Sequence, residues 1–194
     1  MTLGAVELVN QALAKLGQAQ RLTTLDSPDA AAVLASTVLD GARRDEIRRI
    51  APHFARATAT LAATVGTENS AGWWYAFPAD LIRLLRVEPI GEASAWAVEG
   101  RGVRVPGDGQ GVLIYYVRDV PDPAHWDPSF ANLMATRLAW ELAPALTQSD
   151  QTLAKLAREL EDARQAAAQA DAHEGLPVPA VILSEVVAAR YIGV

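Results

Sequence analysis

The chain has 194 residues, a formal net charge of −6 and no cysteine, and 51% of its residues are apolar. This length and apolar share favour a folded domain with its own core. The missing cysteines exclude disulfides, thiol catalysis and thiolate zinc sites, and the acidic charge disfavours a nucleic-acid binder held by phosphate contacts. No basic segment followed by an apolar run opens the sequence, and no apolar stretch approaches the roughly 20 residues of a membrane span. We therefore expect a protein that acts in the cytoplasm or in a particle assembled there.

Two helices are predicted in the first quarter of the chain. Apolar residues recur at helical spacing over 3–16, and Gly17 is a natural stop for this helix. Ser27 is the expected N-cap of the second helix, which has Pro28 in its first turn and runs to about Ile50. Four arginines lie near its end: Arg43, Arg44, Arg48 and Arg49. We interpret them mainly as a solvated helix end that complements the helix dipole.

The middle of the chain changes to a β-like pattern. A dense aromatic run, WWYAFP, occupies 73–78. Strand-like pieces separated by glycine-rich turns follow, which indicates one small antiparallel sheet. The glycine-rich segment 107–111 lies between two of these pieces, whereas a phosphate-binding loop opens a helix, so we interpret it as a hairpin turn. The segment 81–87 is apolar with two arginines, and the strand-like pieces lie at 95–98, 102–105 and 111–117.

Helical patterns return in the last third. Asp127 is expected to cap a helix that Pro128 opens and that Pro144 ends or kinks. Ser149 is expected to cap a last helix over 150–172, which Gly175 stops.

The predicted fold is therefore α+β and helix-dominated, with an antiparallel helical bundle, a small inserted antiparallel β-sheet and an extended C-terminal arm. The first half of the bundle is assigned to 1–52 and the β-rich insertion to 53–120. The second half of the bundle is assigned to 121–174 and the arm to 175–194.

The arm is apolar and β-branched, and Leu-Pro-Val-Pro at 176–179 cannot continue a helix. Such a segment is costly to leave in water, so it packs either on its own domain or on a partner. Addition of a strand to a partner's sheet is the favoured mode. The candidate binding side chains are Val178, Val181, Ile182, Leu183, Val186, Val187, Tyr191 and Ile192.

No pattern typical of catalysis or metal binding emerges. Three isolated histidines lie beside helix boundaries, and the acidic pairs lie in helices rich in arginine and lysine, where helical salt bridges explain them. We expect a protein that is not an enzyme and needs no cofactor or metal. The residues in question are His53, His125, His173, Asp45, Glu46, Glu159, Glu161 and Asp162.

The aromatic run has three interpretations. Trp73, Trp74 and Tyr75 would stack nucleic-acid bases if a basic groove lay beside them. We favour a hydrophobic cluster that joins the sheet to the helices. A third interpretation is a subunit interface, in which Trp126 would also take part, because Trp and Tyr are enriched at interfaces.

Several segments, in their order and spacing, resemble the tail tubular protein A family, the head-to-tail adaptors of short-tailed phages. The resemblance spans residues 3 to about 172, so the arm lies outside it. The segments are NQALAKLGQA at 10–19 with LTTLD at 22–26, RDE at 44–46 through PHFA at 52–55, FPADLIRLLRV at 77–87, and DPSF at 127–130 through LAWELAPALTQS at 138–149.

The resemblance implies a structural virion protein of the phage neck. Twelve copies would form a ring beneath the portal protein, continue the DNA channel without binding the genome specifically, and attach the tail nozzle or the next tail protein. It supplies no catalytic residue to carry over, and it makes the portal or a neighbouring subunit the first candidate partner of the arm. The alternative is a DNA-binding accessory module that uses the cluster Arg43–Arg49 with Trp73–Tyr75.

Overall fold

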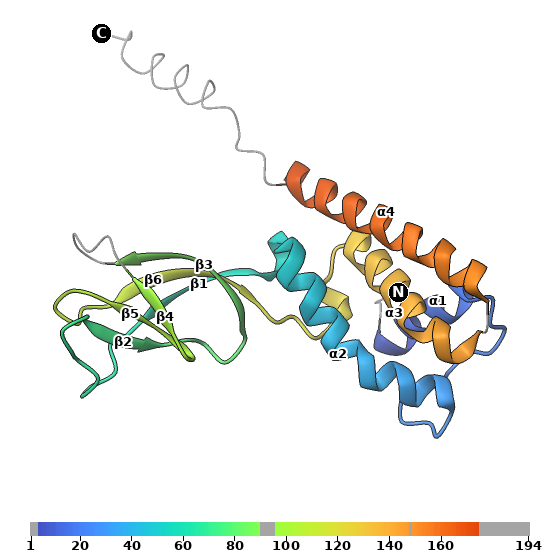
Figure 1. Ribbon diagram of the computed structural model, residues 1–194, viewed down its shortest axis with the longest axis horizontal. Helices are drawn as coiled ribbons and strands as arrows, with labels where there is room; N and C mark the ends of the chain where they lie inside the picture. The colour runs from blue at the N-terminus through green and yellow to red at the C-terminus, as the bar shows by residue number, and fades with distance from the viewer. Residues whose placement is uncertain (1–3, 90–95, 148, 175–194) are drawn as a thin grey trace, which may run out of the picture.

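The computed structural model describes residues 4–89, 96–147 and 149–174 of the chain (Figure 1). The predicted arm at 175–194, with the stop at Gly175, lies outside these residues. The described part combines four α-helices with two small antiparallel sheets, so the predicted α+β class is confirmed. The elements are α1 (Ala5–Lys15), α2 (Ala30–Ile50), η1 (His53–Ala55), β1 (Arg56–Leu61), β2 (Trp73–Ala76), β3 (Leu81–Pro89), β4 (Ala97–Glu99), β5 (Gly102–Val105), β6 (Val112–Arg118), η2 (Pro123–His125), α3 (Pro128–Leu146) and α4 (Asp150–Glu174).

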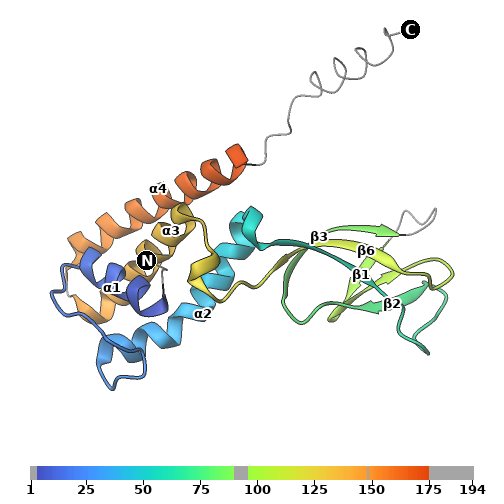
Figure 2. The same cartoon turned by 180° about the vertical axis from the view of Figure 1, so that it is seen from behind.

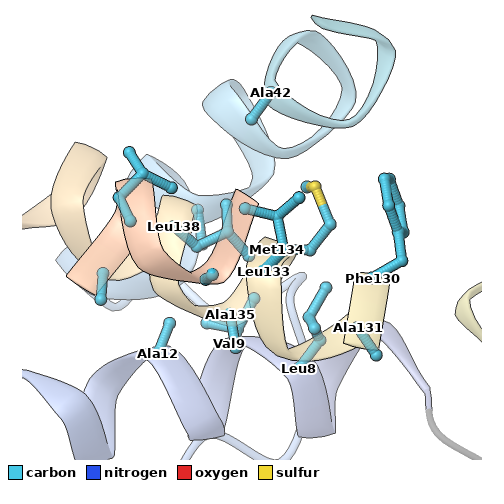
Figure 3. Packing of buried hydrophobic residues seen from close by; sticks show 14 of the residues in the cluster. Leu8, Val9, Ala12, Ala42, Phe130, Ala131, Leu133, Met134, Ala135 and Leu138 are labelled. Atoms are coloured by element: carbon cyan, nitrogen blue, oxygen red, sulfur yellow. The ribbon is translucent and has the colours of Figure 1, made fainter. Parts of the chain in front are cut away.

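The four helices share one hydrophobic core, and we call them the helical unit. Helix α3 contacts α1, α2 and α4, so it lies at the centre of this unit. Figure 3 shows Leu8 and Val9 of α1 beside Ala131 and Ala135, which lie one turn apart on the same face of α3. Alanines line much of this contact, and small side chains let helix axes approach closely.

The helix ends are set by local sequence, as predicted, with one exception. Gly17 ends α1 at φ +75°, and the N–H of Gln18 donates to the carbonyl of Leu13 at 3.0 Å. Asp127 caps α3 by accepting a hydrogen bond from the N–H of Ser129 at 2.7 Å. The predicted start of α2, with Ser27 as its cap and Pro28 in its first turn, is wrong, because α2 begins at Ala30 and the carboxylate of Asp29 caps it by accepting a hydrogen bond from the N–H of Ala31.

The other helix boundaries also follow the sequence. Pro144 lies in the last turn of α3, which ends two residues later. The hydroxyl of Ser149 accepts from the N–H of Thr152 at 3.2 Å, as expected for the cap of α4.

The six strands form two three-stranded sheets, ordered β1-β6-β3 and β2-β5-β4. One hydrophobic cluster draws side chains from both, so the sheets pack on each other, and we call them the β unit. The prediction of a single sheet is wrong for this reason. The prediction of a hairpin at 107–111 is also wrong, because β5 and β6 pair with different strands and this segment crosses between the sheets. The β4–β5 hairpin, with Gly100 at φ +60°, is confirmed.

The β unit lies to one side of the helical unit (Figures 1 and 2). The chain enters it from the end of α2 through η1 and returns from β6 through η2 to α3. The two units therefore have separate cores and meet at the end of α2. No helix in the part of the chain that the structure describes is long and apolar enough to cross a membrane.

Candidate functional site

The eight apolar residues proposed to bind a partner, from Val178 to Ile192, lie outside the described residues. The site is therefore built from the surfaces that the described elements present. Three features bear on it: the aromatic run, the arginines at the end of α2, and the groove where the two units meet.

The aromatic run packs mainly within the β unit. Tyr75 is buried in the cluster shared by the two sheets, and its hydroxyl donates to the carbonyl of Gln110 at 2.6 Å. Trp74 lies so close to Gly102, and Trp73 to Gly109, that a Cβ at either glycine would meet the indole ring. A hydrophobic cluster is thus confirmed, but it joins the two sheets and not the sheet to the helices. The assignment of Tyr75 to a subunit interface is wrong, because other residues of its own chain cover its ring.

Trp126 belongs to the core of the helical unit. Its side chain is buried, its Nε1–H donates to the carbonyl of Val120 at 2.8 Å, and its ring meets Phe130 edge-on at 5.4 Å between centroids. Its assignment to a subunit interface is therefore wrong. Trp73 and Trp74 keep part of their surface exposed, so a subunit contact through these two stays a prediction.

The arginine cluster divides between the interior and the surface. Arg43 is buried, and its Nε and Nη2 donate to the two carboxylate oxygens of Asp119 at 2.9 and 3.0 Å. Arg44 donates to the same carboxylate at 2.8 Å. The interpretation as a solvated helix end holds for the exposed Arg44, Arg48 and Arg49, and it is wrong for Arg43.

Asp119 follows β6 directly, so these bonds tie the β unit to α2. Burial alone raises the pKa of Asp119, but the hydrogen bonds and charges of Arg43 and Arg44 outweigh burial and hold that pKa below its usual range. The carboxylate is therefore ionised at neutral pH, as the contact requires.

A second pair of contacts joins α2 to β3. Arg48 Nη1 donates to the carbonyl of Ile82 at 2.6 Å, and Arg83 Nη1 donates back to the carbonyl of Arg48 at 3.2 Å. Each arginine thus binds the main chain of the other unit. We call these two hydrogen bonds, together with those from Arg43 and Arg44 to Asp119, the joint.

A groove of about 1060 Å³ lies at the joint. Four arginines, 44, 48, 83 and 101, line it with Asp45, Asp80 and Asp119. Its apolar lining includes Phe77 and Leu84, and Val98, which is 58% exposed. An apolar surface framed by arginines is typical of protein interfaces.

The DNA-binding alternative needs the arginines and the aromatic run in one place. The lining of the groove includes Arg44 and Arg48 but none of Trp73–Tyr75, and Arg43 points into the protein. The two parts of that alternative therefore do not share this groove, and the alternative stays a prediction.

Glu46 is a buried charge that the sequence pattern did not reveal. Its carboxylate is fully buried and accepts hydrogen bonds from Arg137 of α3 at 2.8 Å and from Arg164 of α4 at 2.6 Å. We predicted salt bridges within helices, yet these bonds connect three helices. The available signal was spacing, because Glu46 lies one turn after Ala42 on the buried side of α2.

The histidines lie apart, as predicted. His53 Nδ1 lies 2.6 Å from a carboxylate oxygen of Asp171, which joins the end of α2 to α4. His125 and His173 are exposed. Within residues 4–89, 96–147 and 149–174, no group of three or more histidine, aspartate or glutamate side chains is placed to hold a metal ion.

In comparisons with known proteins, no family model matches this chain and no curated protein matches it.

Proposed function

We propose that this chain is a non-enzymatic subunit of a head-to-tail adaptor in a phage virion, which forms a ring beneath the portal, extends the DNA channel and attaches the tail. The observation that carries the proposal is the arrangement of two units with separate cores, connected by a charged joint. A ring subunit needs different surfaces for its neighbours and for the proteins above and below it. Two units on one chain supply such surfaces.

In this proposal the four helices form an antiparallel bundle that packs laterally against its neighbours. The groove at the joint is available for a contact between unlike surfaces of adjacent copies. Such heterologous contacts close into a ring when the rotation between copies allows it. The family resemblance suggests twelve copies and a nozzle or other tail protein below.

The arm provides the attachment to the portal or to a neighbouring subunit. Its apolar side chains from Val178 to Ile192 are costly to expose, and partner contact would remove them from water. Residues up to Glu174 already form two cores, and every buried side-chain nitrogen and oxygen in the described part has a hydrogen-bond partner. Removal of the arm is therefore expected to leave the two units folded.

The test compares the full chain with a variant that stops at Gly175. Each protein is mixed with purified portal rings and viewed by negative-stain electron microscopy, and circular dichroism checks that the helices persist. We expect the full chain to add a ring to the portal and the shortened chain to remain folded but unattached. A full-length variant carrying Val186→Asp and Val187→Asp should fail in the same way, which separates loss of apolar contacts from loss of length.

If the folded, shortened chain docks as well as the full chain, the arm has no role in attachment. If the full chain forms no ring on portals of any short-tailed or long-tailed phage, the adaptor proposal is wrong.

A further inference from the structure

The two ends of the β unit differ in chemistry. Strand β1 ends opposite the start of β6, and β2 starts opposite the end of β5. The loops 62–72 and 106–111, which connect these strands, therefore emerge together at one end of the β unit, and we call this end the tip. In Figures 1 and 2 the tip is the end farthest from the helical unit, whereas the groove at the joint lies at the other end.

The tip exposes an apolar side chain together with two carboxylates. Val65 is 92% exposed, more than any other large apolar residue in the described part of the chain. Glu68 and Asp108 are exposed, and neither loop contains a lysine or an arginine. Arg104 donates to main-chain carbonyls of the first loop, but its charge is paired with Glu99, 2.6 Å from its Nε. The tip therefore presents negative charge and apolar surface that the described part of the chain does not cover.

The groove presents the complementary chemistry. Its apolar lining is partly exposed, and its carboxylates already have partners. Asp119 binds two arginines of α2, Asp45 lies 3.9 Å from an arginine of α3, and Asp80 accepts a hydrogen bond from a tyrosine hydroxyl. Three arginines of the lining make no ion pair within the described part of the chain: Arg48, Arg83 and Arg101.

We propose that the tip of one copy of this chain docks into the groove of the next copy. Val65 then contacts the apolar lining, while Glu68 and Asp108 face the arginines. An apolar contact ringed by complementary charges provides both affinity and a defined register. Because the two surfaces differ and lie at opposite ends of the β unit, each copy binds one neighbour through its tip and the other through its groove. Such a head-to-tail contact closes into a ring when the rotation between copies allows it. The inference rests on the proposed ring, for which it names the contact between neighbours.

The absence of cysteine makes a cross-linking test specific. One full-length protein carries Val65→Cys in the tip, and a second, with a tag that changes its mass, carries Val98→Cys in the groove. In the matched control, the first protein carries Val33→Cys instead, because Val33 is 52% exposed and lies on α2, outside the tip and the groove. Each mixture is treated with a short bismaleimide, both as concentrated protein in solution and on purified portal rings. Denaturing electrophoresis and mass spectrometry then identify the products.

We expect the mixed dimer of tip and groove variants at several times the yield of the control dimer. Adding Glu68→Lys and Asp108→Lys to the tip variant should reduce the yield to that of the control. Adding Arg83→Glu and Arg101→Glu to the groove variant should then restore part of it, because the two surfaces have exchanged their charges. Circular dichroism checks that each variant is folded.

Equal yields in the tip–groove mixture and the control, both in solution and on the portal, would overturn the inference. An excess of dimers linked from tip to tip would also overturn it, because the contact would then be two-fold and not head-to-tail. The result separates this contact from the adaptor role. Rings on the portal without the mixed dimer would reject the contact alone, whereas the mixed dimer in solution without rings on any portal would reject the adaptor role and retain the contact.

Discussion

The helical unit and the β unit bury different chemistry. The buried charged or polar side chains in the described part are Arg43, Glu46 and Thr136, and all three lie in helices. The buried cluster of the β unit is made of valine, leucine, isoleucine and tyrosine. Its tyrosine hydroxyls bond to groups at its edges, such as the carbonyl of Gln110.

This difference indicates what holds each unit together. The helical unit depends on charge pairing, because Glu46 connects α2 to α3 and α4 through two arginines. The β unit depends on close approach of backbones, because Gly102 and Gly109 lie directly under tryptophan rings. A substitution that removes a charge should therefore affect the first unit, and one that adds a methyl group should affect the second.

The largest effect is expected from Glu46→Gln. Arg137 and Arg164, which are partly buried, would lose the fully buried carboxylate that they share, and breaking a buried ion pair costs about 3–5 kcal/mol in the free energy of unfolding. The matched control is Asp45→Asn, since Asp45 is 69% exposed and its nearest arginine nitrogen is 3.9 Å away. We expect the control to change stability by less than about 1 kcal/mol. Urea unfolding measures the change in the free energy of unfolding. Amide hydrogen exchange should become faster in α2, α3 and α4 and stay unchanged in β6. Equal loss of protection in β6 would mean that the two units unfold together.

The pH dependence of the same variant provides a second check. Burial alone raises the pKa of Glu46, but hydrogen bonds and charges from Arg164 and Arg137 outweigh it, so the pKa lies below its ordinary value. The folded protein therefore binds this proton less tightly than the unfolded chain does. The stabilisation is present above the ordinary carboxyl pKa of about 4.3 and is lost as pH falls through the lower folded value. The difference in stability between the wild type and Glu46→Gln should shrink on acidification below about pH 4.

A smaller effect is expected from Gly102→Ala in the β unit. The new Cβ would lie 2.4 Å from the carbonyl oxygen of Tyr75 on the paired strand and 2.4 Å from the ring of Trp74. Overpacking of this kind costs about 1–3 kcal/mol. The control is Gly100→Ala in the same hairpin, which has open space but a φ of +60° and should cost about 1 kcal/mol. Hydrogen exchange in β5 and tryptophan fluorescence distinguish the two variants. A larger loss in Gly100→Ala would show that backbone conformation, and not close packing, limits the β unit.

Most local features of the fold were predictable from the sequence, with the cap of α2 as the exception, and pairings between distant segments were not. Gly17 and Asp127 end and begin helices through bonds to residues within one turn, so their roles can be inferred from adjacent residues. The partition of the strands into two sheets depends on which partners β5 and β6 choose. Alternation along a strand does not specify that choice.

The same distinction explains the errors in the candidate site. Tyr75 and Trp126 are large aromatic residues, which suit a core and an interface equally well, so residue type alone did not decide between them. Glu46 was expected to pair within its helix because that helix is rich in arginine, whereas its shortest bonds go to α3 and α4. Only the packing of three helices brings those arginines to it.

The smallest expected effect concerns the N-cap of α3. It tests whether this central helix of the helical unit is stabilised by its cap or by tertiary packing. Asp127→Ala removes the acceptor for the N–H of Ser129, and loss of an N-cap typically costs about 1 kcal/mol. Asp127→Asn keeps a capping oxygen and should cost only a few tenths of that amount. Because α3 contacts the other three helices, tertiary packing should confine the damage to its first turn, and hydrogen exchange there should quicken while α4 and β6 keep their protection. If the whole of α3 loses protection in Asp127→Ala, the cap and not the packing stabilises this helix. Helix capping would then join the interior charges as an interaction that distinguishes the helical unit from the β unit, which depends on close backbone contact.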